Sequence, residues 1–458
     1  MKLPEPFIQR MKYMLGGDYS AFEASYDEAA VKGIHLNPKR LSEEALLQHF
    51  NGDITPRFNI KYGFNIKSTT GNDFKLGMHP FHHGGAVYSQ DPSAMLPVSG
   101  IEISTDWRVL DLCAAPGGKS SQIASRLSDH GFLLANEPNP SRNKILISNM
   151  ERMGYPNVVV TKLTPQEIAS YYPEYFHMVL VDAPCSGEGM FRKYPESIRE
   201  WSPENVLLCQ QRQKDILSYA VDTLLPGGIL VYSTCTYSVE ENEDIVRWLL
   251  QEYSLKPYAI PESIRRVTAS AFGEDLACCR RSYPHLFQGE GQFMAYFQKT
   301  GTLPDNLSSQ YAGFSPALHK ISSKNSSLVM EAFADHFDLS EISFYEHQDK
   351  IIALPKDHHV LLPPHGITLC GVTAGMIEKN RFTPHHHFFH AYGSLCRNTL
   401  SLPPEDSSIT QYLSGQEIAD DNVSKGYGVI CCEGCPLGGF KASNGRLKNH
   451  YPKALRNL

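Results

Sequence analysis

"VLDLCAAPGGKS", residues 109–120, decides the fold, because an apolar strand runs directly into a Gly-Gly turn and then into a helix. In an open parallel sheet, ligands bind beyond the carboxyl ends of the strands, where glycines let backbone N–H groups approach the ligand. A phosphate-binding P-loop would need a glycine where this chain has Cys113, and the G-x-G-x-x-G dinucleotide fingerprint is missing. An adenosine-like ligand without a phosphate chain remains, and S-adenosylmethionine is the leading candidate.

The segment around this stretch, from about 105 to 300, alternates apolar strands with helical stretches. This alternation is typical of a mainly parallel sheet flanked by helices. Strands are expected at 107–113, 131–137, 157–163, 177–183, 227–234 and 291–300. Helices are expected at 118–128, 140–153 and 203–223, with another after residue 238. Glu137 ends the second strand, about twenty residues beyond the glycine loop, where a carboxylate can accept hydrogen bonds from ribose hydroxyls.

Composition indicates an ordinary globular protein of 458 residues, 41% of them hydrophobic, which corresponds to about three domains. No apolar run reaches the roughly 18 residues that a membrane span needs, and the first residues lack a signal-peptide core. Eleven cysteines, an odd number, fit a reducing compartment in which thiols remain free. We therefore expect a cytoplasmic protein with no membrane partner.

The C-terminal stretch 438–458 is locally basic, although the whole chain has a formal net charge of -7. It contains no acidic residue, and its cations are Lys441, Arg446, Lys448, Lys453 and Arg456. Such a stretch is either a solvated tail or a phosphate-binding edge.

Two cysteines follow two strands of the expected sheet. Cys185 lies in "VDAPCSGEGM", 181–190, and Cys235 lies in "LVYSTCTYSVEEN", 230–242. A cysteine inside an apolar strand is usually a small core residue. Here both thiols lie in polar turns on the same rim as the glycine loop, and Asp182 precedes the first of them. This position favours chemistry over packing.

A methyl donor, two thiols and a carboxylate fit methylation of carbon 5 of cytosine. Carbon 5 is too weak a nucleophile to attack a methyl sulfonium, but a thiolate added to carbon 6 makes it reactive. An acid beside the ring nitrogen stabilises the intermediate, and the enzyme sulfur leaves after carbon 5 loses its proton. The chemistry requires a nucleophilic cysteine, an aspartate at the base edge and a second group that assists release.

Three motifs, "DLCAAPGGKS", "DAPCSGEG" and "YSTCT", occur in the order that resembles the NOL1/NOP2/Sun family of RNA cytosine-C5 methyltransferases. "YSQDPSAMLPV" (88–98) and "RSYPHLFQGEGQFMAYFQK" (281–299) extend the resemblance. "GRLKNHYPKAL" (445–455) is similar to the end of the bacterial RsmF/YebU branch, which methylates 16S ribosomal RNA near the decoding site. The resemblance implies an α/β fold with a class I (Rossmann-like) S-adenosylmethionine-dependent methyltransferase domain.

The resemblance also assigns roles to residues. It implies that Cys235 is the nucleophile, that Cys185 acts in product release and that Asp182 holds the base edge. The implied cofactor site consists of Cys113, Ala114, Ala115, Pro116, Gly117, Gly118, Lys119, Glu137, Arg142 and Asp182. One departure concerns the adenine contact: relatives carry an aspartate after the third strand, where this chain has Thr164, with Glu167 nearby.

Four parts are expected along the chain: an N-terminal RNA-binding segment (1–90), the methyltransferase domain (91–302), a connecting small domain (303–379) and a PUA-like RNA-binding domain (380–458). The Ser-rich "ISSKNSSL" (321–328) suggests a flexible connection or a turn. Lys441, Arg446, Lys448 and Lys453 are the candidate RNA-binding residues. We expect a monomer whose partner is 16S ribosomal RNA or the small ribosomal subunit.

No metal site is expected. "CCEGC" offers Cys432 and Cys435 at ligand spacing, and "HHHFFH" (385–390) offers four histidines. A structural zinc needs four ligands from two such pairs, and no second cysteine pair with the usual spacing is evident.

Other functions compete with this interpretation. A DNA cytosine methyltransferase would use the Pro-Cys thiol and would not need Cys235. A tRNA cytosine-C5 methyltransferase shares the same chemistry, and a non-catalytic ribosome assembly factor would not need both thiols and Asp182. A protein or small-molecule methyltransferase does not explain paired cysteines.

Overall fold

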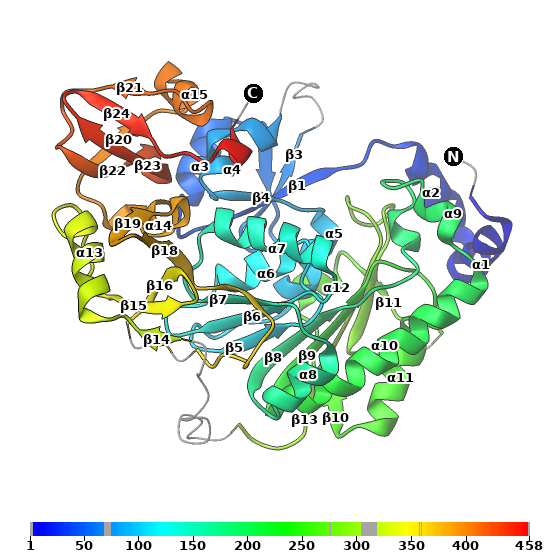
Figure 1. The fold of residues 1–458 in the computed structure, drawn as a ribbon. Helices are drawn as coiled ribbons and strands as arrows, with labels where there is room; N and C mark the ends of the chain where they lie inside the picture. The colour runs from blue at the N-terminus through cyan, green and yellow to red at the C-terminus, as the bar shows by residue number, and fades with distance from the viewer. Residues whose placement is uncertain are drawn as a thin grey trace.

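The computed structural model describes residues 3–67, 75–273, 276–303, 318–356, 358 and 360–456. Within these residues, the centre of the fold is a ten-stranded sheet with strand order β11-β12-β13-β9-β8-β5-β6-β7-β17, and β10 pairs with β13 (Figure 1). The parallel strands are β5 (Arg108–Asp111), β6 (Phe132–Asn136), β7 (Val158–Thr161), β8 (Phe176–Asp182) and β9 (Leu224–Thr234). The antiparallel strands of one flank are β10 (Leu255–Pro257), β11 (Ala269–Ser270), β12 (Cys279–Ser282) and β13 (Gln292–Lys299).

Helices cover both faces of this sheet because neighbouring strand residues point to opposite sides. Val109 and Leu133 pack with α6 (Gly118–Ala124) and α7 (Pro140–Met153) on one face. Leu110 and Leu134 pack on the other face, with α8 (Pro165–Tyr171), α10 (Pro203–Thr223) and α11 (Glu243–Glu252). This layering confirms the α/β fold class and the mainly parallel sheet flanked by helices that was expected for the methyltransferase domain.

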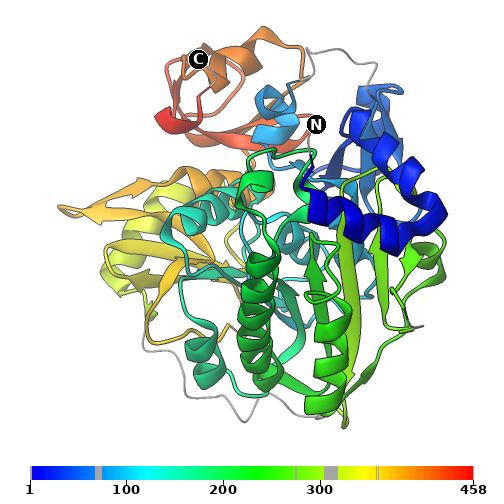
Figure 2. The same ribbon diagram turned by 90° about the vertical axis from the view of Figure 1, so that its right-hand side faces the viewer.

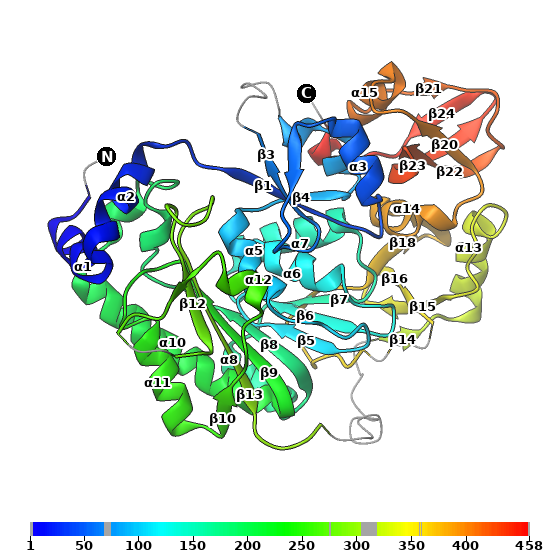
Figure 3. The ribbon, with the colours of Figure 1, turned by 180° about the vertical axis from the view of Figure 1, so that it is seen from behind.

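The N-terminal part contacts both the central sheet and the C-terminal sheet. Helices α1 (Glu5–Leu15) and α2 (Tyr19–Ala24) pack Phe7 and Phe22 against Trp201 and Tyr237. A four-stranded sheet follows, with strand order β2-β3-β1-β4, and it shares a core with the C-terminal sheet (Figure 3). The bounds are β1 (Lys32–Leu36), α3 (Glu43–Phe50), β2 (Ile54–Pro56), β3 (Gly63–Ile66), α4 (Pro80–His83), β4 (Val87–Ser89) and α5 (Pro92–Ser99).

Two five-stranded sheets follow residue 318, at the side of the molecule away from α1 (Figures 1 and 2). The first has strand order β14-β15-β16-β18-β19 and carries α13 (Ser323–Phe333) and α14 (His386–Ala391). Its strands are β14 (His319–Lys320), β15 (Ile342–His347), β16 (Lys350–Pro355), β18 (Val372–Glu378) and β19 (Arg381–Pro384). β17 (Ile367–Cys370), which lies between β16 and β18 in the sequence, pairs antiparallel with β7 and so joins the central sheet.

The C-terminal sheet has strand order β20-β22-β23-β24-β21 and is accompanied by α15 (Ser407–Leu413). Its strands are β20 (Thr399–Leu402), β21 (Ile418–Ala419), β22 (Gly426–Cys432), β23 (Cys435–Ser443) and β24 (Arg446–Asn449). The basic stretch is therefore an ordered β-hairpin over most of its length rather than a solvated tail. In the described chain, no helix is both long and apolar enough to cross a membrane.

The Ser-rich segment 321–328 was wrongly expected to be a flexible connection or a turn. It forms the first part of α13, where the Ser322 hydroxyl accepts a hydrogen bond from the Asn325 N–H and caps the helix. Val329 and Phe333 are buried one helical turn apart, which anchors the helix to the sheet. The serine content suggested flexibility, but the helix cap and the buried apolar face stabilise a helix here.

Candidate active site

Two thiols meet at the carboxyl edge of the central sheet. β8 and β9 are parallel neighbours, so the turns that follow them emerge side by side. The sulfur atoms of Cys185 and Cys235 lie 3.2 Å apart, and both side chains are partly exposed. The hydrogen bond to Cys235 and burial raise the pKa of the Cys185 thiol well above its usual value. Cys185 therefore stays protonated and can donate to the Cys235 sulfur.

Asp182, the last residue of β8, links the thiol turns to the glycine loop. Lys119 Nζ, from α6, donates to Asp182 Oδ2 at 2.8 Å. Ser233 Oγ, from β9, donates to Asp182 Oδ1 at 2.6 Å. The family resemblance placed Lys119 in the cofactor site. In the structure Lys119 contacts the carboxyl group of Asp182, which is expected to hold the base edge. These two donors fix the direction of the Asp182 carboxyl group at the rim.

The loop between β5 and α6 carries the expected cofactor residues Cys113, Ala114, Ala115, Pro116 and Gly117, and α6 begins at Gly118. Gly117 has φ +113°, and a Cβ there would lie 2.9 Å from Met150 Cε, so the turn needs glycine. Burial raises the pKa of the Cys113 thiol, and the carboxylates of Asp111, Asp182 and Glu137 raise it further. Three acids therefore surround this loop.

Glu137 lies at the end of β6 with only 4% of its side chain exposed. Its Oε1 accepts from the Asn139 N–H at 2.9 Å, and its Oε2 lies 3.3 Å from Arg142 Nη1. Arg142 also donates to the Ala115 carbonyl at 2.9 Å. Arg142 therefore ties Glu137 to the glycine loop and positions both.

Asp111 is a buried acid that the sequence interpretation missed. Its Oδ2 accepts from Ser120 Oγ at 2.6 Å, while its buried Oδ1 has no hydrogen-bond partner among the described residues. Burial raises the pKa of Asp111 to about 7, and the nearby Asp182 adds to the shift. Its position in "VLDLC", at the end of the strand before the loop, was the available signal.

These residues fit a cationic, adenosine-containing group. S-adenosylmethionine carries a sulfonium and an ammonium, which favour the carboxyl groups of Asp111 and Asp182 at the loop. Glu137, held by Arg142 at the end of the next strand, can accept from ribose hydroxyls. The backbone at Gly117 and Gly118 leaves room that a larger residue would fill.

Thr164 and Glu167, the two candidates for the missing adenine contact, hydrogen-bond to each other. Thr164 caps α8, and the Glu167 carboxylate accepts from both the Thr164 N–H and the Thr164 hydroxyl at 2.8 Å. This is a capping box, in which each side chain satisfies a helix-terminal group. The departure from the family pattern thus has a structural use here.

Glu188 is a second buried acid that the sequence interpretation did not identify, and it lies between the Cys185 turn and the Cys235 turn. It is fully buried in the Cys185 turn and accepts four hydrogen bonds, three of them from residues that directly follow Cys235. The donors are Trp201 Nε1 (2.9 Å), Thr236 Oγ1 (2.9 Å), the Tyr237 N–H (2.8 Å) and Ser238 Oγ (2.7 Å). Glu188 thereby links the turn that carries Cys185 to the turn that carries Cys235.

We expect Glu188→Gln to lower the free energy of unfolding by about 2 kcal/mol and to slow methyl transfer. In the glutamine side chain, an NH₂ group replaces one of the two carboxylate oxygens. That NH₂ group would face a donor that cannot accept a hydrogen bond: Trp201 Nε1–H at the Oε1 position or the Tyr237 N–H at the Oε2 position. Urea denaturation and initial rates measure the two effects. The exposed Glu196→Gln in the same segment makes the same chemical change and should alter neither; equal effects would contradict the role of Glu188.

Glu241 is a third buried acid that the sequence interpretation missed, and like Glu188 it contacts the turn of Cys185. It accepts from the Ser186 N–H at 3.0 Å, from the Ser186 hydroxyl and from Gln213 Nε2 at 2.8 Å. Burial raises the pKa of Glu241 to about 7. Acidic residues in a polar turn are usually solvent-exposed, so neither Glu188 nor Glu241 could be recognised as buried from the sequence.

The raised pKa of Glu241 predicts a pH dependence of stability. The folded protein binds this proton more tightly than the unfolded chain, so rising pH from about 4.5 to about 7 should lower the free energy of unfolding. We expect Glu241→Gln to lose this part of the slope, measured by urea denaturation across that range. Glu252→Gln, exposed on α11, should keep the wild-type slope; an unchanged slope in Glu241→Gln would refute the assignment.

The candidate RNA-binding residues lie apart from the thiols, on the C-terminal sheet. Lys441 is in β23, Arg446 and Lys448 are in β24, and Lys453 follows; all four side chains are exposed. Lys441 pairs in register with Lys448. Cys432 and Cys435 are buried partners across the β22–β23 hairpin, and residues 386–390 form most of α14. No group of three or more metal-ligating side chains occurs among the described residues.

Comparison with protein families accounts for most of the chain. Residues 100–298 match the model of 16S rRNA methyltransferase RsmB/F. Residues 3–92 match the N-terminal domain of 16S rRNA methyltransferase RsmF, and residues 399–457 match the methyltransferase RsmF PUA domain. The chain is also 30% identical to the ribosomal RNA small subunit methyltransferase F of Cronobacter sakazakii, covering 99% of this chain and 96% of that protein. The chain belongs to the RsmF family.

Further relatives agree with the RsmF family. The ribosomal RNA small subunit methyltransferase F of Vibrio vulnificus is 29% identical, covering 99% of this chain and 97% of that protein. A solved methyltransferase homolog protein from Pyrococcus horikoshii superposes with a TM-score of 0.57 at 26% identity, covering 65% of this chain and 95% of that one. NSun6 from the same organism, solved with SFG, gives 0.56 at 18% identity, covering 65% and 99%. This protein is an S-adenosylmethionine-dependent RNA methyltransferase.

Proposed function

We propose that this RsmF-family protein methylates carbon 5 of cytidine in 16S ribosomal RNA, near the decoding site, through a covalent bond between Cys235 and carbon 6 of the base. The observation that carries the proposal is the pair of sulfur atoms 3.2 Å apart, at the rim that also bears Asp182 and the glycine loop. Methyl transfer to oxygen or nitrogen needs no such pair, whereas carbon 5 of cytosine must be activated by a nucleophile.

Each residue has one task in the proposed reaction. The Cys235 thiolate adds to carbon 6, forms the S–C6 bond and moves electron density toward carbon 5 and nitrogen 3. Asp182, oriented by Lys119 and Ser233, meets the ring at the N3–N4 edge and stabilises this charge through hydrogen bonds. S-adenosylmethionine supplies the electrophilic methyl group when bound. Carbon 5 then loses its proton to a base, the S–C6 bond breaks, and Cys185 assists the departure of the Cys235 sulfur.

RNA recognition is proposed to involve the ends of the chain. We propose a division into 1–90, 91–302, 303–379 and 380–458, with RNA-binding parts at both termini; the family matches at 3–92 and 399–457 support distinct N-terminal and C-terminal parts. Lys441, Arg446, Lys448 and Lys453 would contact phosphates. The target cytidine must leave its stack, because a thiolate cannot reach carbon 6 inside a duplex. Small-subunit RNA as the substrate implies that the protein acts in the cytoplasm, and we propose that it acts as a monomer.

Tritium release tests the chemistry and bisulfite mapping tests the site. RNA labelled with tritium at carbon 5 of cytidine should release tritium to water as methyl groups are transferred, because the carbon 5 proton must leave. Bisulfite sequencing of 16S ribosomal RNA from cells with and without the protein identifies the modified position. Methyl transfer without tritium release would refute carbon 5 as the acceptor. Modification of tRNA alone would refute the proposed substrate.

A further inference from the structure

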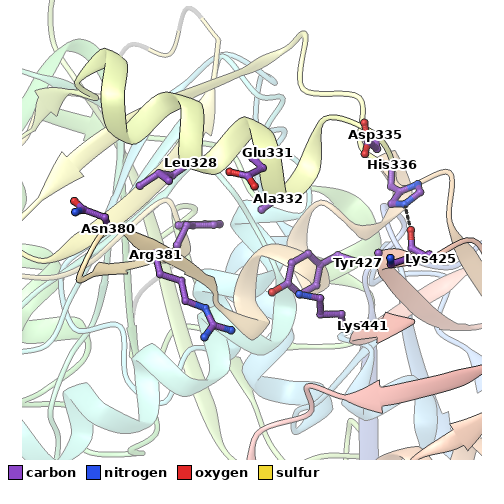
Figure 4. Close-up of a pocket in the computed structure, with 12 residues that line it drawn as sticks. Leu328, Glu331, Ala332, Asp335, His336, Asn380, Arg381, Lys425, Tyr427 and Lys441 are labelled. Carbon is purple, nitrogen blue, oxygen red and sulfur yellow. Dashed lines mark hydrogen bonds between the residues drawn. The ribbon is translucent and has the colours of Figure 1, made fainter. Parts of the chain in front are cut away.

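A cavity of about 350 Å³ opens between the two C-terminal sheets, apart from the thiols. α13 lies on one side of it, and the β18–β19 hairpin, β22 and β23 line the rest (Figure 4). Its volume lies at the low end of the range for small-ligand sites. Because two separate units of the fold line it, the cavity exists only when both are in place.

Three cations, Arg381, Lys425 and Lys441, line the cavity, and none has an acid partner among the described residues. Arg381 begins β19, and its guanidinium forms no hydrogen bond or ion pair with any described residue. Lys441 Nζ has no ion pair among the same residues and lies 4.9 Å from the centroid of the Tyr427 ring. Unpaired, exposed cations beside a hollow are a favourable site for a phosphate, and arginine can bind one through two N–H groups.

Tyr427 forms an aromatic wall of the cavity. Its ring packs against Phe389 (centroids 5.8 Å apart) and His450 (5.6 Å), which fixes its orientation, yet the residue is only half-buried. Burial raises the pKa of Tyr427, and the charge of Arg381, which lines the same cavity, lowers it. A rigid, partly exposed ring beside two cations suits a base that stacks while its phosphate is bound.

The opposite wall is acidic, which limits what the cavity can hold. Glu331 and Asp335 lie on and just after α13, and Figure 4 shows Glu331 across the hollow from Arg381 and Tyr427. A chain of phosphates filling the cavity would meet these carboxylates, whereas a single nucleotide directs one phosphate to one side only. Its amino-bearing base edge can then donate to Glu331.

We propose that this cavity, defined by Arg381, Tyr427, Lys441 and Glu331, binds one unpaired nucleotide of the RNA substrate at a distance from the target cytidine. The phosphate contacts Arg381 and Lys441, and the base stacks on Tyr427. The proposal rests on RNA as the substrate and not on the chemistry at carbon 5. It gives the enzyme a second contact that distinguishes an RNA with an unpaired nucleotide from a continuous duplex.

Equilibrium filter binding of a 16S ribosomal RNA transcript to the full-length protein, without S-adenosylmethionine, tests the cavity. We expect Arg381→Ala and Tyr427→Leu each to weaken binding about tenfold, as loss of a phosphate or stacking contact does. Arg381→Ala should also reduce the slope of log K against log salt by about one, and Tyr427→Leu should leave it unchanged. Tyr427→Phe keeps the ring and should bind like the wild type.

The matched control is Lys324→Ala, which removes an exposed cation from α13 outside the cavity and should change neither affinity nor slope. Equal effects of Arg381→Ala and Lys324→Ala would overturn the proposal in favour of a diffuse basic surface. Normal affinity of Tyr427→Leu, with an unchanged melting temperature, would also overturn it. Failure of tritium release would refute the proposed chemistry and leave these binding results standing, so the two proposals fail separately.

Discussion

Cys235→Ala is expected to abolish methyl transfer to RNA, by on the order of 10⁴-fold or more, because without the thiolate carbon 5 of cytosine has no activating nucleophile. The side chain projects from a turn at the carboxyl end of β9 and is partly exposed, so the substitution should leave the fold intact. Initial rates with radiolabelled S-adenosylmethionine measure the loss.

Binding of S-adenosylmethionine and of RNA provides the control for this variant. Cys235 is not among the residues expected to hold the cofactor, so the dissociation constants of both ligands should stay within about twofold of the wild type. Loss of cofactor binding in Cys235→Ala would indicate a damaged site. Wild-type rates in this variant would disprove the nucleophile assignment.

Cys185→Ala is expected to trap the reaction instead of preventing it. With no thiol 3.2 Å from the Cys235 sulfur, release from carbon 6 slows, turnover falls by roughly 10²-fold or more, and a covalent protein–RNA adduct accumulates. The raised pKa of the Cys185 thiol keeps its proton in place at neutral pH, which suits a group that assists departure and not one that attacks. A denaturing gel with labelled RNA detects the adduct as a slow band.

The double variant Cys185→Ala with Cys235→Ala distinguishes a true intermediate from non-specific cross-linking. It should form no adduct, because the bond to carbon 6 comes from Cys235. If Cys235→Ala kept the adduct and Cys185→Ala lost it, the two roles would be exchanged. Protease digestion followed by mass spectrometry of the Cys185→Ala adduct should place the nucleotide on Cys235.

Sequence pattern was sufficient to predict the five parallel strands of the central sheet, its strand β13 and the meeting of the two thiols, but not β10, β11, β12 or β17. Parallel strands end at a common edge, so Cys185 after β8 and Cys235 after β9 had to emerge together once both strands were recognised. The pattern could not predict Glu188 and Glu241. Their partners Trp201 and Gln213 lie on other segments, and an acid in a polar turn looks solvated until the helix that buries it is in place.

The helix α13 and the capping box at Thr164 show a second limit. Serine lowers helix propensity in the interior of a helix but favours the N-cap, so the same residues predict opposite structures depending on where the helix begins. That choice depended on Val329 and Phe333, which are buried only because a sheet lies beneath them. Long-range packing decided what local composition left open.

The pairing of β17 with β7 has a consequence for how the protein is made. Residues 367–370 complete the central sheet about 70 residues after its strand β13 has ended, so a chain still emerging from the ribosome holds β7 with an unpaired edge. Domains generally fold as they are synthesised, N-terminal parts first. Here the catalytic half of the chain must wait for a strand from the half that follows, and a message truncated before that strand would yield a methyltransferase core prone to aggregate.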